Sequence, residues 1–352
     1  MLTLNTGVTF SGPNQFTRGL VLIAPIGGSQ VQLINYKGEV VHEWQVGNGF
    51  TNWCYLLPNG NLFINERCDN RKGVALTGSG LMREYDWDGN LLWEHLDPYQ
   101  HHDARKLPQG GAAYLAFTEL TPSEAAQVKG GVPHSESPGG LYGEAVRVVD
   151  ENGALVWEWD LAQLDNDKFP LHANANRWSR GHTNTVCPLD DGTYLISCKV
   201  LNLIFIVDPK TDKIIWYKQD VIMSGQHDAQ QLENGNILVF ANGVYSSDLH
   251  FSQVLEIDPA TKEIAWAYKA KDNPQGFFSP HIGGAQRLAS GNTLICEGAK
   301  GCLFEVTPEG DIVWEYVCPQ MVDVPGFGEI NWLFRALHYL EDSQEIQGRV
   351  KA

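Results

Sequence analysis

The stretch VRVVDENGALVWEW, residues 146–159, is the unit from which the fold of this chain can be inferred. An apolar strand leads into an Asn-Gly turn, and a second apolar strand ends in tryptophan, which is the pattern of a β-hairpin. Five similar hairpins occur along the chain. Their tryptophans recur roughly every 50 to 65 residues, at Trp44, Trp93, Trp157, Trp216, Trp266 and Trp314.

A second kind of hairpin separates the tryptophan hairpins. Its first strand repeatedly begins with histidine, as in HHDARKLPQGG (101–111), HTNTVCPLDDG (182–192), HDAQQLENG (227–235) and HIGGAQRLASG (281–291). It turns at a glycine and continues as a second apolar strand. Each repeat therefore predicts four antiparallel strands, and a repeat of about 50 residues with four strands is typical of a β-propeller blade.

The six repeats predict an all-β fold, a six-bladed β-propeller that occupies residues 1–352 as a single domain. The N-terminal segment would supply three strands of one blade, GLVLIAP, VQLINY and VVHEW. The C-terminal segment NWLFRALHYL would supply the first strand of that same blade. Pairing of the two chain ends closes the ring, because it removes the sheet edges that an open ring would expose.

The composition argues against several kinds of partner. The formal net charge of −17 disfavours nucleic acid and anionic membrane surfaces, which both need a basic face. No apolar run has the length of a membrane span, and the N-terminus lacks the features of a signal peptide. The seven cysteines include no CxxC pair, so reduced core thiols are expected. We therefore expect a cytoplasmic protein with a small-molecule substrate and no nucleic-acid or membrane partner.

The recurring histidines lie at one end of the first strand of each blade, and this strand lines the central channel of a propeller. We align the six first strands on the glycine of the following turn and apply strand alternation. The alignment predicts that four histidines, one arginine and two asparagines face the channel near one mouth. The histidines are His281, His102, His182 and His227, the arginine is Arg335, and the asparagines are Asn52 and Asn184. His101 alternates away and is expected to support His102.

Two long insertions, residues 119–144 and 161–181, leave the strands at the same end as the histidines. Long loops that gather over one face commonly form a binding site or a lid. We expect them to cover the histidines, with Phe169, Trp178 and Tyr142 as apolar contacts. Trp178 and Arg180 complete the predicted substrate-binding set with Asn52 and Asn184.

This arrangement resembles the aryl-sulfate sulfotransferase (arylsulfotransferase) family, in a short form without a signal peptide. The resemblance is carried by the opening strands RGLVLIAP and VQLINYKGEVVHEW, the His-His-Asp strand HHDARKLPQGG and the closing strand NWLFRALHYL. It implies an enzyme that moves a sulfuryl group from an aryl sulfate to a phenol through a channel histidine, without metal or cofactor. It also implies that the other histidines and an arginine hold the sulfate and assist proton transfer. From its position along the ring, His281 is the expected nucleophile.

The residues suit this chemistry. A neutral imidazole is a competent nucleophile near pH 7. Charge on the sulfuryl oxygens needs fixed donors, which His102, His227, Asn184 and Arg335 would supply. A cation that faces the channel favours an anion over a metal ion.

Two alternative functions stay open at this stage. Four converging imidazoles, from His102, His182, His227 and His281, would also suit a divalent metal such as Mn, Fe, Ni or Zn. The protein would then be a metal-dependent lyase or hydrolase acting on a sugar or an aromatic substrate. The second alternative is a non-catalytic scaffold that binds partners on its rim.

Overall fold

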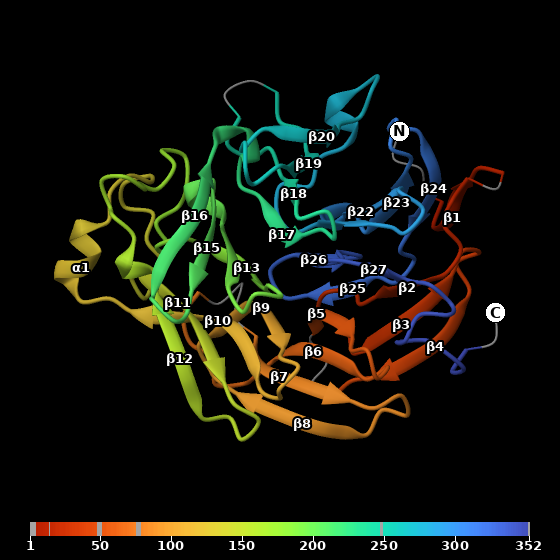
Figure 1. Ribbon diagram of the computed structural model, residues 1–352, viewed down its shortest axis with the longest axis horizontal. Helices are drawn as coiled ribbons and strands as arrows, with labels where there is room; N and C mark the ends of the chain where they lie inside the picture. The colour runs from red at the N-terminus through yellow and green to blue at the C-terminus, as the bar shows by residue number, and fades with distance from the viewer. Residues whose placement is uncertain (1–4, 14, 48–50, 75–78, 247–248, 351–352) are drawn as a thin grey trace.

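Six antiparallel sheets form a ring, so the fold is a six-bladed β-propeller as predicted (Figure 1). The computed structural model describes residues 5–13, 15–47, 51–74, 79–246 and 249–350, except for the side chains of residues 51 and 52. No helix among these residues is long and apolar enough to cross a membrane.

Five blades follow one another along the chain, and the strand named first in each lies nearest the centre of the ring. Four of these blades contain four strands and one contains five. They are β5 (Thr51–Leu56), β6 (Leu62–Arg67), β7 (Gly80–Tyr85) and β8 (Leu91–Leu96); β9 (Gln100–Lys106), β10 (Ala112–Glu119), β11 (Tyr142–Val149) and β12 (Leu155–Asp160); β13 (Thr183–Pro188), β14 (Tyr194–Cys198), β15 (Leu203–Asp208) and β16 (Lys213–Gln219); β17 (His227–Gln231), β18 (Ile237–Ala241), β19 (Gln253–Ile257) and β20 (Ile264–Tyr268); β21 (Gly284–Arg287), β22 (Thr293–Glu297), β23 (Cys302–Val306), β24 (Ile312–Val317) and the added β1 (Gly7–Ser11).

The sixth blade joins the two ends of the chain, which confirms the predicted ring closure. Its strand order is β27 (Leu337–Tyr339), β2 (Leu20–Ile23), β3 (Gln30–Asn35) and β4 (Val40–Gln45). β2 pairs antiparallel with β27, with Leu20 opposite Tyr339 and Leu22 opposite Leu337. β1 was not anticipated from the sequence: it pairs with the outer edge of β24 and gives that blade a fifth strand.

The repeated tryptophans connect neighbouring blades. Each indole N–H donates to a residue in the outer turn of the next blade, as in Trp44 to the Asp86 carbonyl at 3.0 Å and Trp216 to the Pro259 carbonyl at 2.7 Å. Trp314 completes the circle by donating to the carbonyl of Tyr36 at 2.9 Å. The tryptophan recurs because each blade needs one long apolar side chain with a single donor at its junction with the next blade.

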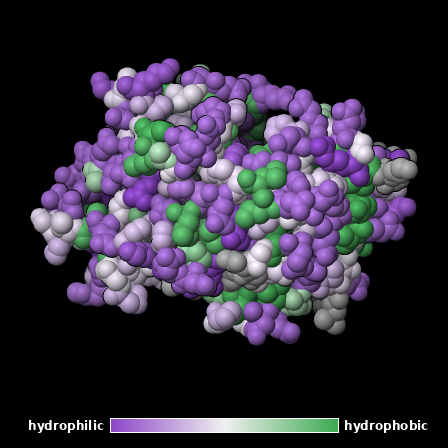
Figure 2. All heavy atoms as spheres, turned by 90° about the horizontal axis from the view of Figure 1, so that it is seen from below, coloured by the Kyte–Doolittle hydropathy of each residue, from purple (hydrophilic) through white to green (hydrophobic). Residues whose placement is uncertain are grey.

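Apolar side chains fill the spaces between blades, and the seven cysteines are free. The outer strands carry scattered apolar residues such as Leu91 and Leu92 of β8, which are 50% and 55% exposed. The face on the side of β8 is mostly hydrophilic with separate hydrophobic areas (Figure 2). Such scattered apolar residues are normal on a protein surface.

The two long insertions pack against each other. The first contains α1 (Pro122–Gln127), which begins with a capping box formed by Thr121 and Glu124. The Arg177 guanidinium of the second insertion donates to the carbonyl of Gly130 in the first at 2.6 Å. α1 lies at the outer edge of the ring (Figure 1), so this part of the expected lid lies to the side of the ring. Two of the predicted apolar contacts are used for packing, since Phe169 is buried in the core and Tyr142 lies against Phe117.

A short hairpin that the sequence analysis passed over lies near the centre of the ring instead (Figure 1). It consists of β25 (Val322–Val324) and β26 (Gly328–Ile330), within the connection from β24 to β27. The ring of Trp332, which follows it, is 4.6 Å from His281 and 5.1 Å from Phe327 between centroids. The hairpin therefore packs, through Phe327, on the tryptophan that contacts His281.

Candidate active site

The inner strands are irregular where the predicted site residues lie. β9, β13 and β17 each contain a shift of register against their neighbours. His102 (φ 50°), His182 (φ 47°) and Asp228 (φ 54°) adopt the left-handed conformation in or beside these strands. This conformation is unfavourable for residues other than glycine, and it concentrates at functional sites. It also interrupts the simple alternation of side chains from which the site was predicted.

Two of the predicted catalytic histidines, His102 and His182, lie in contact. Their rings are 5.0 Å apart between centroids, in an edge-to-face arrangement. His101 does not point away from this pair: its Nδ1 is 2.8 Å from Nδ1 of His102. His101 therefore contacts His102 directly, which is the contact that the expected supporting role of His101 requires.

The other two predicted catalytic histidines are held by different neighbours. Nδ1 of His227 is 2.7 Å from Oδ1 of Asn242. The Asn242 amide donates to the carbonyls of Ser279 and Ile282, so its oxygen is the atom that faces the imidazole. His227 must therefore carry its proton on Nδ1, which leaves the lone pair on Nε2. His281 packs edge-on against Trp332 and is only partly buried.

Lys199 lies beside these histidines. It begins a 3-10 turn (Lys199–Leu201) after β14, and its backbone N–H donates to the carbonyl of His182 at 3.3 Å. In the described part of the chain no acidic residue forms an ion pair with it. Burial lowers the pKa of Lys199 to about 8.

The charge of Lys199 lowers the pKa of each of the four histidines. Burial, together with Lys199 and Arg335, lowers the pKa of His102 to about 3. Burial, and to a smaller extent the charge of Lys199, lower the pKa of His281 to about 4. The same two causes, with neighbouring histidines, hold the pKa values of His182 and His227 well below the ordinary value. All four imidazoles are therefore neutral at pH 7 beside a lysine that is largely charged.

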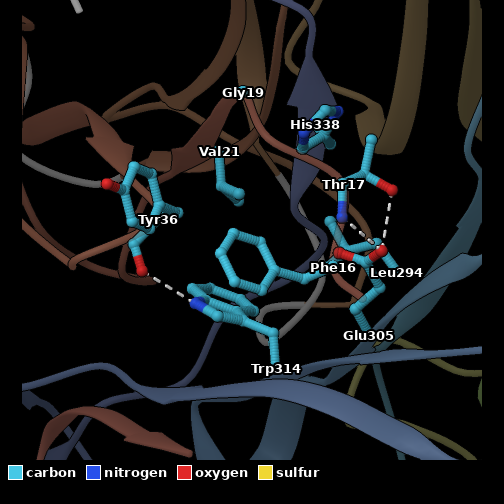
Figure 3. A pocket seen from close by; sticks show the side chains of 9 residues that line it. All are labelled: Phe16, Thr17, Gly19, Val21, Tyr36, Leu294, Glu305, Trp314 and His338. Carbon is cyan, nitrogen blue, oxygen red and sulfur yellow. Dashed lines mark hydrogen bonds between the residues drawn. The ribbon is translucent and has the colours of Figure 1, made fainter. Parts of the chain in front are cut away.

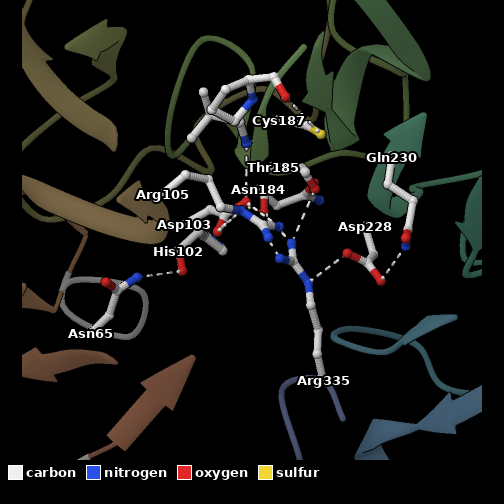
Figure 4. A network of polar contacts seen from close by, with 12 residues as sticks. Asn65, His102, Asp103, Arg105, Asn184, Thr185, Cys187, Asp228, Gln230 and Arg335 are labelled. Carbon is white, nitrogen blue, oxygen red and sulfur yellow. Dashed lines mark hydrogen bonds and ion pairs between the residues drawn. The ribbon is translucent and has the colours of Figure 1, made fainter. Parts of the chain in front are cut away.

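Arg335 is engaged in a buried ion-pair network (Figure 4). Its Nη1 is 3.3 Å from Asp103 Oδ2, and its Nε is 3.0 Å from Asp228 Oδ1. Arg105 also pairs with Asp103, at 3.3 Å. Two carboxylates thus balance two guanidinium groups, so Arg335 is not a free cation of the kind we expected from the sequence.

The predicted substrate-binding residues differ in their surroundings. The Asn184 amide donates to the Gln226 carbonyl at 2.7 Å, and its backbone carbonyl accepts from Arg335 at 2.9 Å. Arg180 is 2% exposed, and its guanidinium nitrogens have no hydrogen-bond partner among the described residues. Trp178 is partly buried, and its carbonyl accepts from the backbone N–H of Tyr142. The side chain of Asn52 lies outside the described residues.

His338 lies apart from the other histidines. It lines a small pocket between the blade of β27 and the blade of β24, together with Gly19, Glu305 and Trp314 (Figure 3). Within the described ranges, no three His, Cys, Asp or Glu side chains are arranged so that they could hold a metal ion.

Several residues that shape the site were not predicted from the sequence: Lys199, Asp103, Asp228, Asn242 and Glu144. One signal was available for Lys199, because strand β14 ends at the mouth where the histidine strands begin. The two aspartates directly follow His102 and His227 in the sequence. They give no separate signal, because only the fold brings them to Arg335.

Three solved structures share this architecture at low sequence identity. A protein of unknown function from Bacteroides caccae is 14% identical, with 92% of this chain and 99% of that chain covered, at a TM-score of 0.56. The Cps50 (Swd1) β-propeller domain of Myceliophteria thermophila is 14% identical, with 90% and 87% covered, at 0.53. A streptogramin B lyase is 11% identical, with 91% and 86% covered, at 0.51. At these identities the likeness shows the fold alone.

The fold and the inner-strand residues define a six-bladed β-propeller that carries histidines beside a lysine. No curated protein matches the chain. The sequence model of the arylsulfotransferase (ASST) family matches residues 157–318. This match and the propeller fold support assignment of the chain to the arylsulfotransferase family, which agrees with the resemblance seen in the sequence.

Proposed function

We propose that this protein transfers a sulfuryl group from an aryl sulfate to a phenolic acceptor, at a site formed by the four histidines and Lys199. The observation that carries the proposal is the Lys199 ammonium group, which has no ion-pair partner among the described residues and lowers the pKa of all four histidines. Neutral imidazoles supply nucleophiles and proton acceptors, and the ammonium group attracts an anion. The family assignment points to the same chemistry.

We assign the nucleophile to His227, in preference to the His281 favoured by sequence position. Asn242 orients His227 so that the Nε2 lone pair is available. In the first step Nε2 attacks sulfur, the N–S bond forms, and the ester S–O bond breaks to release the phenolate. In the second step the oxygen of the acceptor phenol attacks sulfur, the N–S bond breaks, and a neighbouring imidazole takes the phenolic proton.

The remaining groups have distinct tasks in this proposal. The Lys199 ammonium balances charge on the sulfuryl oxygens, which is where charge accumulates during transfer. His182 and His102 lie in contact and provide the base for the acceptor. Trp332 and Phe327 offer apolar ring surface beside His281 for the aryl group. Arg335 holds the inner strands together and does not contact the sulfuryl group.

The test is incubation with 4-nitrophenyl sulfate and phenol. We expect release of 4-nitrophenol, formation of phenyl sulfate, and a sulfuryl mass increment on His227 when the acceptor is omitted. His227→Ala should abolish the increment, whereas His134→Asn, at an exposed position, should leave it unchanged. An increment on His281 would reassign the nucleophile to that residue.

A chelator separates this proposal from the metal-dependent alternative. Sulfuryl transfer by histidine should continue in the presence of EDTA. Activity that disappears with EDTA and returns with Mn, Fe, Ni or Zn would support a lyase or hydrolase and refute the proposal. No turnover of any aryl sulfate would favour the non-catalytic scaffold.

A further inference from the structure

A buried carboxyl group lies beside His101, which in turn contacts His102. Glu144, at the start of β11, is completely buried, as is His101. Nε2 of His101 is 3.6 Å from Oε1 of Glu144, slightly longer than a hydrogen bond. Nδ1 of His101 is 2.8 Å from Nδ1 of His102. The three side chains therefore form a line from the interior of the blade to His102.

We propose that Glu144 and His101 form a buried proton relay that sets which ring nitrogen of His102 carries the proton. This inference rests on the proposed function, because it gives His102 the role of base toward the acceptor phenol. Glu144 and His101 are positioning residues in this scheme, since neither contacts the substrate.

The tautomers follow from the contacts. A neutral imidazole has one N–H, so in the contact between the two Nδ1 atoms one ring donates and the other accepts. When Glu144 is ionised, the proton of His101 is favoured on Nε2, which faces the carboxylate, and its Nδ1 accepts. His102 must then carry its proton on Nδ1, which leaves the Nε2 lone pair free to act as a base.

The relay also accounts for the fate of the phenolic proton. When His102 Nε2 takes this proton, the Nδ1 proton of His102 passes to Nδ1 of His101. The Nε2 proton of His101 then passes to Oε1 of Glu144. One proton enters at His102 and one arrives on Glu144, so both imidazoles are neutral at the end. Repeating the transfers in reverse returns the proton to the site.

The surroundings fit such a relay. Burial holds the pKa of His101 well below its ordinary value, although a backbone hydrogen bond with Ala116 raises it. Burial, Lys199 and Arg335 lower the pKa of His102, so a lasting imidazolium is unfavourable at either residue. Burial raises the pKa of Glu144 to about 7, although it accepts from the backbone N–H groups of Thr183 and Gly181. The carboxyl group is thus the member of the line that holds a proton most readily near neutral pH.

Other charged and titratable groups face the two ends of the line. Arg180, from the segment before β13, and Cys198, from β14, lie near Glu144. Lys199, Arg335 and His182 face His102. The ring of Phe117 stacks on His101 at 4.0 Å and keeps the orientation of that imidazole fixed.

The first test follows the His102 tautomer by ¹⁵N NMR of histidine-labelled protein, without any substrate. In the wild-type protein we expect the Nδ1–H form of His102 above pH 8 and the Nε2–H form below pH 6, because Glu144 becomes protonated near pH 7. A His102 tautomer that stays the same across this range would overturn the relay. This result does not depend on turnover, so it separates failure of the relay from failure of the proposed function.

The second test compares Glu144→Gln with Glu305→Gln. Glu305 is a matched control, because it is a buried carboxylate that accepts from the backbone N–H and hydroxyl of Thr17, as Glu144 does from Thr183. In Glu144→Gln the tautomer of His102 should no longer change with pH, while Glu305→Gln should behave like the wild type. A pH-dependent tautomer in Glu144→Gln would contradict the assignment of Glu144. If Glu144→Gln does not fold, the pH titration of the wild-type protein still shows whether the tautomer of His102 changes near pH 7.

A kinetic measurement adds a readout that a purely structural role would not change. Transfer from 4-nitrophenyl sulfate to phenol should be about 100-fold slower in Glu144→Gln, which is the scale of general-base effects. Transfer to a strongly acidic nitrophenol that is already ionised should be slowed much less, because it needs no base. An equal loss for both acceptors would contradict the relay.

Discussion

Asn242 holds His227 in one tautomer: its Oδ1 is 2.7 Å from Nδ1 of His227, and its amide donates to the carbonyls of Ser279 and Ile282 at 2.8 and 2.9 Å. Asn242 follows β18, whereas the two carbonyls belong to the segment that leads into β21. The contact therefore couples the orientation of a predicted catalytic residue to the junction between two blades. Five predictions follow from this and similar relationships.

Removal of the Asn242 side chain should disorient the nucleophile. In Asn242→Ala we expect sulfuryl-histidine formation to slow by about 10- to 100-fold, since His227 loses the partner that fixes its lone pair. The measurement is the rate of 4-nitrophenol release in the first turnover. Asn234→Ala, which removes an amide from the turn between β17 and β18, is the control. An unchanged first-turnover rate in Asn242→Ala would assign the nucleophile elsewhere.

Lys199 should contribute through its charge. Lys199→Met is expected to lower kcat/KM for an aryl sulfate by about 100-fold or more, the usual effect of removing one group that stabilises a developing oxyanion. Lys300→Met is the matched control, because Lys300 lies in the corresponding 3-10 turn after β22 and pairs with Glu297 at 2.6 Å. Equal losses in the two variants would argue against an anion at Lys199.

The pH dependence of the first step should have two limits. The neutral form of the nucleophile His227 is active, and burial and Lys199 hold the pKa of His227 well below its ordinary value. The rate should therefore stay constant as the pH falls through the ordinary titration range of histidine, and fall only at lower pH. The protonated form of Lys199 is active, so the rate should fall as the pH rises through about 8. The measurement is kcat/KM for 4-nitrophenyl sulfate. Lys199→Arg should move the alkaline limit to higher pH, and a limit that does not move would exclude Lys199 as its source.

Ring closure should be sensitive to Gly19, at the start of the blade that joins the chain ends. A Cβ at this position would lie 2.4 Å from Nε2 of His338 and 2.5 Å from the carbonyl of Tyr339. We expect Gly19→Ala to lower the free energy of unfolding by about 2 kcal/mol, because it forces β2 away from β27. Gly276→Ala is the control, since Gly276 has no positive φ and the nearest atom to its added Cβ is 3.7 Å away. Urea denaturation measures both, and equal effects would contradict this account.

Arg335 should matter for stability. Arg335→Met leaves Asp103 and Asp228 buried without their shared partner, which should lower the free energy of unfolding by about 3–5 kcal/mol. Lys129→Ala breaks an exposed ion pair with Asp167 and should cost about 1 kcal/mol or less. Denaturant unfolding compares the two variants. A small effect of Arg335→Met would mean that the carboxylates find other partners.

The sequence alone determined the fold, because the blade is a local unit. A hairpin turn, alternating strands and a tryptophan lie within a few residues of one another, and six copies leave little freedom in how the ring is built. The closing strand was also predictable, since the first blade lacked one strand and the C-terminus offered one. The hydrogen-bond partners of the tryptophans could not be predicted, because they belong to a turn of the neighbouring blade. This turn is 42 to 58 residues away for five tryptophans and 278 residues away for Trp314.

The composition of the candidate site was only partly determined by the sequence. The repeated position of His102, His182, His227 and His281 was visible, because each precedes a similar turn. The left-handed residues in the inner strands were not visible, and they change which side chains share a face. This is why His101 contacts His102, although simple alternation predicted that it points away.

Only the tertiary structure decided how charge is distributed around these histidines. Arg335 seemed a free cation in the sequence, but the fold places it between Asp103 and Asp228 from two other blades. Lys199 comes from the 3-10 turn after β14 and supplies the positive charge instead. Coulomb interactions depend on distance through space and on burial, so neither pairing can be read from neighbours in the chain.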